Sequence, residues 1–159
     1  MKKFLFSIAF TLTIITVTQA QNFSGHYTID SKEMIDGIEY LNAIAQEITV
    51  TQTKDSITIT RVTPAGNDQT TTSTVALPLN GKVMASNAGN RKRTAVISFD
   101  KAKNTATIIS TYSYEGKDDV QFKNTEIWEL SADGTLTIIK TSDATETDDW
   151  TIKAIFKKV

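Results

Sequence analysis

The residues best suited to catalysis are few in this sequence. His26 is the one histidine among the 159 residues, and there is no cysteine. In a regular strand His26 lies on the opposite face from Phe23 and Tyr27, which places it toward solvent. There is no glycine-rich phosphate loop and no nucleophile elbow. A carboxylate pair of the glycosidase kind is open to any fold with two acids, but nothing indicates one. We therefore expect no enzymatic activity and no cofactor.

Four acidic residues lie close together near the C-terminus, and they could be considered as ligands of a metal ion. The residues are Asp143, Glu146, Asp148 and Asp149. Carboxylate oxygens suit hard cations, but this spacing does not match a calcium-binding loop. A solvated acidic turn is the favoured interpretation, and we expect no metal site.

A second group of polar residues interrupts stripes that are otherwise apolar. The group comprises Arg61, Asn124, Glu126 and Lys140, with Trp128 in the same stripe as Glu126. If these stripes face inward, they form a pocket with apolar walls and few polar groups, as is typical of small-molecule sites. Arg61 and Glu126 would then pair, or hold a ligand's head group. The alternatives are that Trp128 belongs to the core, and that the polar residues sit where strands leave the fold or a bulge reverses the face.

The elements that must position these residues are β-strands. Apolar and polar residues alternate with period two in short segments separated by tight turns. The segments are 47–53, 56–62, 72–78, 94–100, 105–114, 119–131, 135–143 and 147–159. Such spacing predicts an antiparallel meander, and closure removes the exposed edges of an open sheet. We predict an all-β fold, a single up-and-down barrel of eight to ten strands, with a two-layer sandwich as the alternative.

The segment 30–46 departs from period two. Met34, Ile38, Leu41 and Ala45 recur at spacings of three and four, which predicts a short helix after the first strand. Gly37 in the middle costs such a helix about 1 kcal/mol relative to alanine. A loop packed by its apolar residues is the alternative.

The N-terminus and the charge balance bear on localisation and partners. Lys2 and Lys3 precede an apolar run, and Ala20 ends a small-residue cleavage pattern, so residues 1–20 are predicted to be a signal peptide. The expected product is a secreted or periplasmic monomer, residues 21–159, with no membrane span. The formal net charge is −1, and the one basic cluster, residues 91–93, is interpreted as a solvated loop. We therefore expect no nucleic-acid partner.

The stretch NFSGHYTID, residues 22–30, resembles the first strand of the lipocalin and fatty-acid-binding-protein superfamily. In that superfamily a Gly-x-Trp motif follows an aromatic residue at the closed end of the barrel. Here Phe23, Gly25 and Tyr27 are similar to that barrel-closing motif, with tyrosine in the tryptophan position. The stretch WELSADGTLTI, residues 128–138, is similar to a hairpin of small secreted lipocalin-like bacterial proteins.

The resemblance implies a lipocalin-like barrel that binds a small apolar or amphipathic molecule. The candidate ligand-binding residues are then Arg61, Asn124, Glu126, Trp128 and Lys140. The alternative is a barrel of the same kind with an interior filled by side chains, which contacts another protein and holds no ligand.

Overall fold

The computed structural model describes residues 21–117 and 119–159, so the expected signal peptide lies outside the described residues. These residues form ten β-strands and no helix. The strands are β1 (Gly25–Asp36), β2 (Glu47–Gln52), β3 (Ser56–Gly66), β4 (Gln69–Pro78), β5 (Met84–Ala88), β6 (Arg91–Asp100), β7 (Thr105–Tyr114), β8 (Phe122–Leu130), β9 (Leu136–Ala144) and β10 (Trp150–Lys158).

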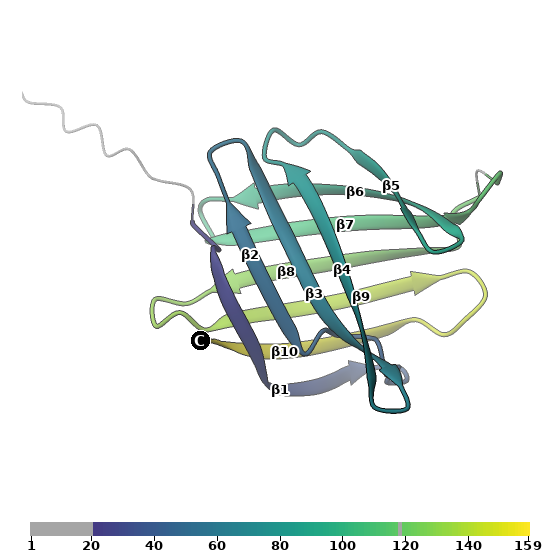
Figure 1. Ribbon diagram of the computed structural model, residues 1–159, viewed down its shortest axis with the longest axis horizontal. Helices are drawn as coiled ribbons and strands as arrows, with labels where there is room; N and C mark the ends of the chain where they lie inside the picture. Colours follow the sequence, from purple (N-terminus) through teal and green to yellow (C-terminus); the bar gives the residue numbers. More distant parts are fainter. Residues whose placement is uncertain (1–20, 118) are drawn as a thin grey trace, which may run out of the picture.

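All ten strands belong to one antiparallel sheet that curls into a barrel (Figure 1). Neighbours along the chain are neighbours in the sheet, and β1 pairs with β10 to join the two ends of the chain. The order runs from β4 at one edge to β5 at the other, and these two edges are not hydrogen-bonded to each other. Because β4 nevertheless contacts β6, the barrel is nearly closed. The predicted all-β up-and-down barrel is confirmed, and the architecture is compatible with a lipocalin-like fold.

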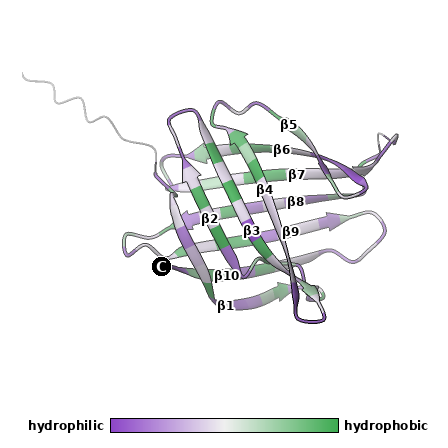
Figure 2. Cartoon of the chain, viewed as in Figure 1, coloured by the Kyte–Doolittle hydropathy of each residue, from purple (hydrophilic) through white to green (hydrophobic). Residues whose placement is uncertain are grey.

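The period-two pattern creates the core of the barrel. In β10, for example, Trp150, Ile152, Ala154 and Phe156 are buried and the residues between them are not. Isoleucine, valine and threonine favour such half-buried strands because their branched side chains fit the pleated surface. Apolar and polar positions accordingly alternate along the ribbons (Figure 2). Burial of one face of strands such as β7, β9 and β10 positions the residues that line the interior.

One end of the barrel is closed by aromatic side chains. Phe23, Tyr27, Trp128 and Phe156 are fully buried there, and the ring centroids of Phe23 and Trp128 lie 6.1 Å apart. The hydroxyl of Tyr27 donates a hydrogen bond to the Phe23 carbonyl at 2.9 Å, and burial raises the pKa of Tyr27. Phe23 and Tyr27, for which the resemblance implied a barrel-closing role, thus lie together in this buried aromatic cluster.

Gly25 belongs to the same closed end. A Cβ at Gly25 would lie 2.6 Å from Cε of Lys158 and 3.1 Å from the Tyr27 ring. Glycine leaves room here for the Tyr27 ring and for the Lys158 side chain, whose Nζ donates to the Ser24 carbonyl at 2.9 Å.

The helix predicted within residues 30–46 is wrong. β1 continues to Asp36 because its backbone pairs with β10 as far as Thr151, and a loop follows over residues 37–46. Gly37, at φ +77°, turns the chain out of the strand. The apolar spacing misleads because Ile38 and Leu41 are 56% and 58% exposed, and not one face of a helix. The alternative of a packed loop holds for Ala43, Ile44 and Ala45, which are buried.

Within residues 21–117 and 119–159 there is no helix of the length and apolar character needed to cross a bilayer.

Candidate ligand-binding site

The interior changes from apolar to polar along the barrel axis. Strand pairing places Ile108, Glu126, Lys140 and Ile152 side by side in one inward-facing row. The next row, farther from the closed end, consists of Ser110, Asn124, Ser142 and Trp150. The row on the other side, nearer the closed end, contains Trp128 between Ala106 and Ile138. Polar groups therefore begin directly above the aromatic base.

Arg61 and Glu126 form an ion pair within this interior. Nη2 of Arg61 lies 2.8 Å from Oε2 of Glu126, and the two side chains are only 15% and 13% exposed. The indole nitrogen of Trp128 donates to the same oxygen at 2.9 Å, and the Arg61 guanidinium stands 5.7 Å from the Trp128 ring centroid. The pairing expected from the sequence is thus present, and it joins the polar layer to the aromatic base.

The charge of Glu126 is strongly stabilised by these neighbours. Burial alone would raise its pKa, but the positive charges of Arg61 and Lys140 and the hydrogen bonds from Trp128 and Arg61 lower the pKa of Glu126 to about 2. Glu126 is therefore ionised at neutral pH.

Lys140 connects the wall of the barrel to the 37–46 loop. Its Nζ donates to the carbonyl oxygen of Ala43 at 2.8 Å and lies 5.4 Å from the Trp150 ring centroid. Burial lowers the pKa of Lys140, as do Arg61 and Arg93, and Glu126 opposes that effect. Tyr40 of the same loop packs against Trp150 with ring centroids 6.3 Å apart. The loop thus covers part of the open end of the barrel.

Two further arginines face the interior, and the sequence interpretation missed them. Residues 91–93 are the start of β6 and not a solvated loop, so that interpretation is wrong. Nη2 of Arg93 donates to Ser110 at 3.1 Å, and the Arg91 guanidinium stands 5.2 Å from the Phe122 ring centroid. The alternation of the strand could have revealed them. Every second residue lies on the same face, so Arg91 and Arg93 share the face of the buried residues Ala95 and Ile97. Lys92, between them, is exposed.

A pocket of about 340 Å³ opens above the polar rows. Its aromatic walls are Tyr40, Phe122 and Trp150, and its basic and amide groups are Asn42, Arg91, Asn124 and Lys140. Oδ1 of Asn124 is buried without a hydrogen-bond partner. A buried polar atom of this kind is costly unless something supplies the missing contact.

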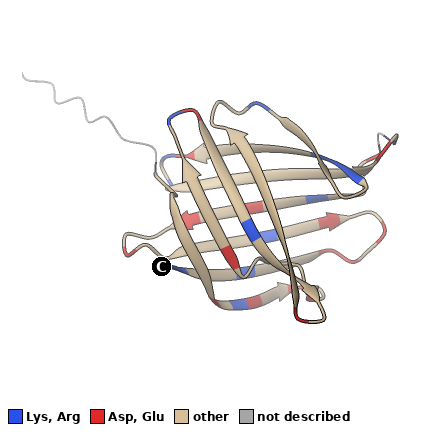
Figure 3. Cartoon of the chain, in the orientation of Figure 1, with Lys and Arg blue, Asp and Glu red and all other residues tan. Residues whose placement is uncertain are grey.

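The five predicted ligand-binding residues do not all reach this pocket. Asn124 and Lys140 line it, whereas Arg61, Glu126 and Trp128 are not among its lining residues and lie deeper in the barrel. The structure adds Arg91, Phe122 and Trp150 to the candidates. Figure 3 shows that most charged positions lie toward strand ends and turns, and that β3 has a single basic position, which is Arg61.

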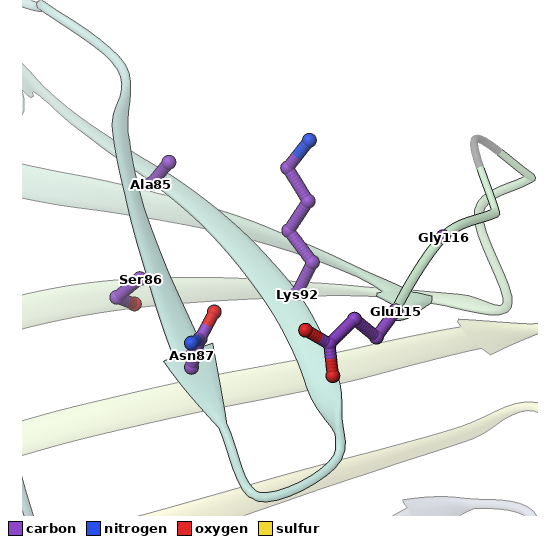
Figure 4. A pocket seen from close by; sticks show the side chains of 6 residues that line it. All are labelled: Ala85, Ser86, Asn87, Lys92, Glu115 and Gly116. Carbon is purple, nitrogen blue, oxygen red and sulfur yellow. The ribbon is translucent and has the colours of Figure 1, made fainter.

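Two other hollows lie away from the interior. One, of about 420 Å³, is lined by Ala85, Ser86, Asn87, Lys92 and residues 115–116, and Asn87 is paired with the outward-facing Lys92 (Figure 4). The other, of about 450 Å³, lies between Lys54, the β4–β5 connection and Phe99. Neither brings together buried charged groups as the open end does.

The groups considered for catalysis or metal binding lie elsewhere. His26 is exposed, and its Nδ1 lies 2.9 Å from the hydroxyl oxygen of Thr49. In the acidic turn, Oδ1 of Asp149 accepts a hydrogen bond from the backbone nitrogen of Ala144 at 2.8 Å. Over residues 21–117 and 119–159 no three histidine or acidic side chains gather in a way that would hold a metal ion.

The geometry of the open end is therefore the main guide to function. No protein-family model matches the chain, and the comparison with curated proteins finds no match.

Proposed function

We propose that the protein binds a small amphipathic molecule in the pocket at the open end of the barrel. The observation that carries the proposal is the composition of this pocket, in which the rings of Tyr40, Phe122 and Trp150 face a few fixed polar groups. Its volume of about 340 Å³ falls at the lower end of the range for small-molecule sites. The ligand is correspondingly short, because side chains fill the barrel below it.

A protein-interaction role is the second candidate, and one observation favours it. Ile35, Ile38 and Leu41 are each more than half exposed and close together in the chain. Exposed apolar residues that cluster in this way are typical of contact surfaces. The filled aromatic base also agrees with a barrel whose interior is structural. We favour ligand binding because neither observation accounts for the buried, unpartnered amide oxygen of Asn124 in the pocket wall.

Export is part of the proposal, and it rests on the sequence of residues 1–20 alone. Lys2, Lys3 and the apolar run that follows them direct the chain out of the cytoplasm, with cleavage after Ala20. The exported protein should then begin at Gln21, as N-terminal sequencing would establish. A mature protein that begins at Met1 would contradict this part of the proposal.

The binding proposal is tested by calorimetric titration with two probes of nearly equal shape, 2-naphthoate and 2-naphthamide. Ala144→Phe adds a ring at the pocket wall and removes no polar side chain, so it should abolish binding of whichever probe binds the wild type. Lys123→Phe is the matched control, because it adds the same ring to the outer face of the neighbouring strand.

Failure of both probes to bind the wild-type protein would contradict the proposal. Binding that survives Ala144→Phe unchanged would contradict it as well, since the probe would then lie outside this pocket.

A further inference from the structure

We infer that the ligand is a short aromatic acid whose carboxylate is held by Arg91 and Lys140. The inference rests on the proposed function, because it assigns a chemical class to the occupant of the same pocket. Its support comes from the balance of charge inside the barrel, from the unused hydrogen-bond donors at the pocket, and from the shape of the pocket walls.

The inward-facing positions of β3, β6, β8 and β9 contain more positive than negative charge. The basic residues at these positions are Arg61, Arg91, Arg93 and Lys140, and the one acidic residue is Glu126. Glu126 is bound to Arg61. Every other ion pair found within residues 21–117 and 119–159 involves other basic side chains. The single charge of Glu126, which also lies beside Lys140, does not balance these cations, and an anionic ligand at the pocket would offset the cost of their partial burial.

Arg61 is not available to the ligand, because it already forms an ion pair with Glu126. Its guanidinium is already bound to Glu126 and stands over Trp128, below the pocket. Arg91 and Lys140, by contrast, both line the pocket. The head group therefore belongs to these two residues and not to Arg61, for which the sequence left open either an ion pair with Glu126 or a contact with the head group.

Both residues have donors to offer. A lysine ammonium has three N–H donors, and Lys140 uses one of them on the Ala43 carbonyl. Arg91 has five, and its Nε makes only a long contact of 3.3 Å to Gln121 Oε1. The rings of Phe122 and Tyr114, at 5.2 and 5.5 Å, fix the position of the Arg91 guanidinium. A positioned guanidinium suits a planar carboxylate, which it can bind through two parallel hydrogen bonds.

Asn124 completes the polar part of the site. Its Oδ1 has no partner in its present orientation, although it lies in the wall between the two cations. A half-turn of the amide exchanges oxygen and nitrogen, and the NH₂ group then faces the same position as a donor. Among the described residues that line the pocket, Asn124 is the one with a buried side-chain polar atom that has no partner, and a rotation that brings its NH₂ group to the pocket would let an anion accept a hydrogen bond from it.

The apolar part of the site selects a ring over a long chain. Phe122 stacks on Tyr112 with centroids 4.3 Å apart, while Trp150 and Tyr40 form the facing wall. Because Tyr112 and Arg91 cover the Phe122 ring and Lys140 stands over the Trp150 ring, a flat ligand ring would meet these walls by edge-to-face contacts. A long alkyl chain would need to continue toward the base, where Trp128 and the Arg61–Glu126 pair occupy the space.

The test compares 2-naphthoate, its neutral isostere 2-naphthamide and the alkyl acid dodecanoate by calorimetric titration. Wild-type protein should bind the naphthoate at least about tenfold more tightly than the naphthamide, as expected for hydrogen bonds to a charged group. Lys140→Met and Arg91→Met should each remove about tenfold of the affinity for the naphthoate and leave the naphthamide nearly unchanged.

Lys92→Met is the matched control, since it removes a positive charge from the outward-facing residue next to Arg91. It should change neither affinity, and circular dichroism of each variant establishes that the barrel is folded.

The outcomes separate this inference from the proposed function. Equal binding of naphthoate and naphthamide, or an equal loss of both in the two variants, would overturn the anion site and leave ligand binding in place. Tighter binding of dodecanoate than of naphthoate would overturn the aromatic class. Failure of every probe would overturn the inference together with the proposed function.

Discussion

The guanidinium of Arg61 reaches the carboxylate of Glu126 across the barrel, at 2.8 Å from Nη2 to Oε2. Their strands, β3 and β8, are not neighbours in the sheet, because β2, β1, β10 and β9 lie between them. The pair therefore links opposite walls of the barrel through its interior, one layer above the aromatic base. Most other charge pairs of the protein lie on its surface, so this one should have a distinct effect on stability.

Arg61→Met should lower the free energy of unfolding by about 3 kcal/mol, because it leaves the Glu126 carboxylate without its main partner in a poorly solvated place. The double variant Arg61→Met/Glu126→Gln should recover much of that loss, since it removes both charges. Urea denaturation measures both values.

Lys157→Met provides the comparison for this ion pair. It breaks the exposed pair with Asp30, where the side chains are 65% and 40% accessible, and should cost less than about 1 kcal/mol. Similar losses in Arg61→Met and Lys157→Met would mean that the interior pair is effectively solvated.

Acid stability should depend on Glu126. Despite its burial, Arg61, Lys140 and Trp128 hold the pKa of Glu126 at about 2, below the ordinary value of 4.5. As the pH falls, the unfolded chain binds this proton first, so the stabilisation is complete above pH 4.5 and is lost progressively toward pH 2. Glu126→Gln should show a flatter dependence of the unfolding free energy over that range, measured by urea denaturation at successive pH values. An unchanged slope in the variant would assign the acid sensitivity to other carboxyl groups.

The closed end should be sensitive to Tyr27. Tyr27→Ala removes a fully buried ring that contacts the core, and should cost about 3–5 kcal/mol in chemical denaturation. Tyr27→Phe keeps the ring and loses only the hydrogen bond to the Phe23 carbonyl, so about 1 kcal/mol is expected. A loss well below 1 kcal/mol for the alanine variant would show that the ring does not close the barrel.

The fold followed from the sequence to the extent that local alternation decides it. Strands with one apolar face, such as 94–100 and 105–114, were predicted because period two sets which residues are buried. β5 was missed because all five of its residues are exposed and it has no such pattern. The false helix over 30–46 arose because long-range pairing of β1 with β10 outweighs a local spacing of apolar residues.

The site was predictable only in part. Arg61 and Lys140 could be placed inside because each follows two apolar residues on the same face of its strand, and Glu126 because Phe122 and Trp128 share its face. Arg91 and Arg93 were not predicted, because they precede the apolar residues of their strand and, with Lys92, form a basic run that was interpreted as a solvated loop. Which charges meet could not be deduced, since Arg61 and Glu126 are brought together only by closure of the barrel. The contact of Lys140 with Ala43 could not be predicted from residue type, because Ala43 contributes only its backbone carbonyl.

Gly37 offers a test of how the 37–46 loop is attached to the barrel. A Cβ at this position would overlap the carbonyl oxygen of Asp149 and lie 2.9 Å from Cα of Trp150. Both are backbone atoms, so they cannot move without displacing the start of β10. Gly81 has the same φ of +77°, but a Cβ there would meet nothing within 4 Å.

Gly81→Ala should therefore lower the free energy of unfolding only by the strain of a left-handed residue, about 1–2 kcal/mol. Gly37→Ala adds the overlap and should cost about 1–3 kcal/mol more. Because Trp150 lines the pocket, Gly37→Ala should also weaken binding of 2-naphthoate, whereas Gly81→Ala should not. Urea denaturation and titration of the two variants measure these differences. Equal losses of stability would mean that the loop moves away from β10 at little cost, and Gly37 would then serve only to turn the chain.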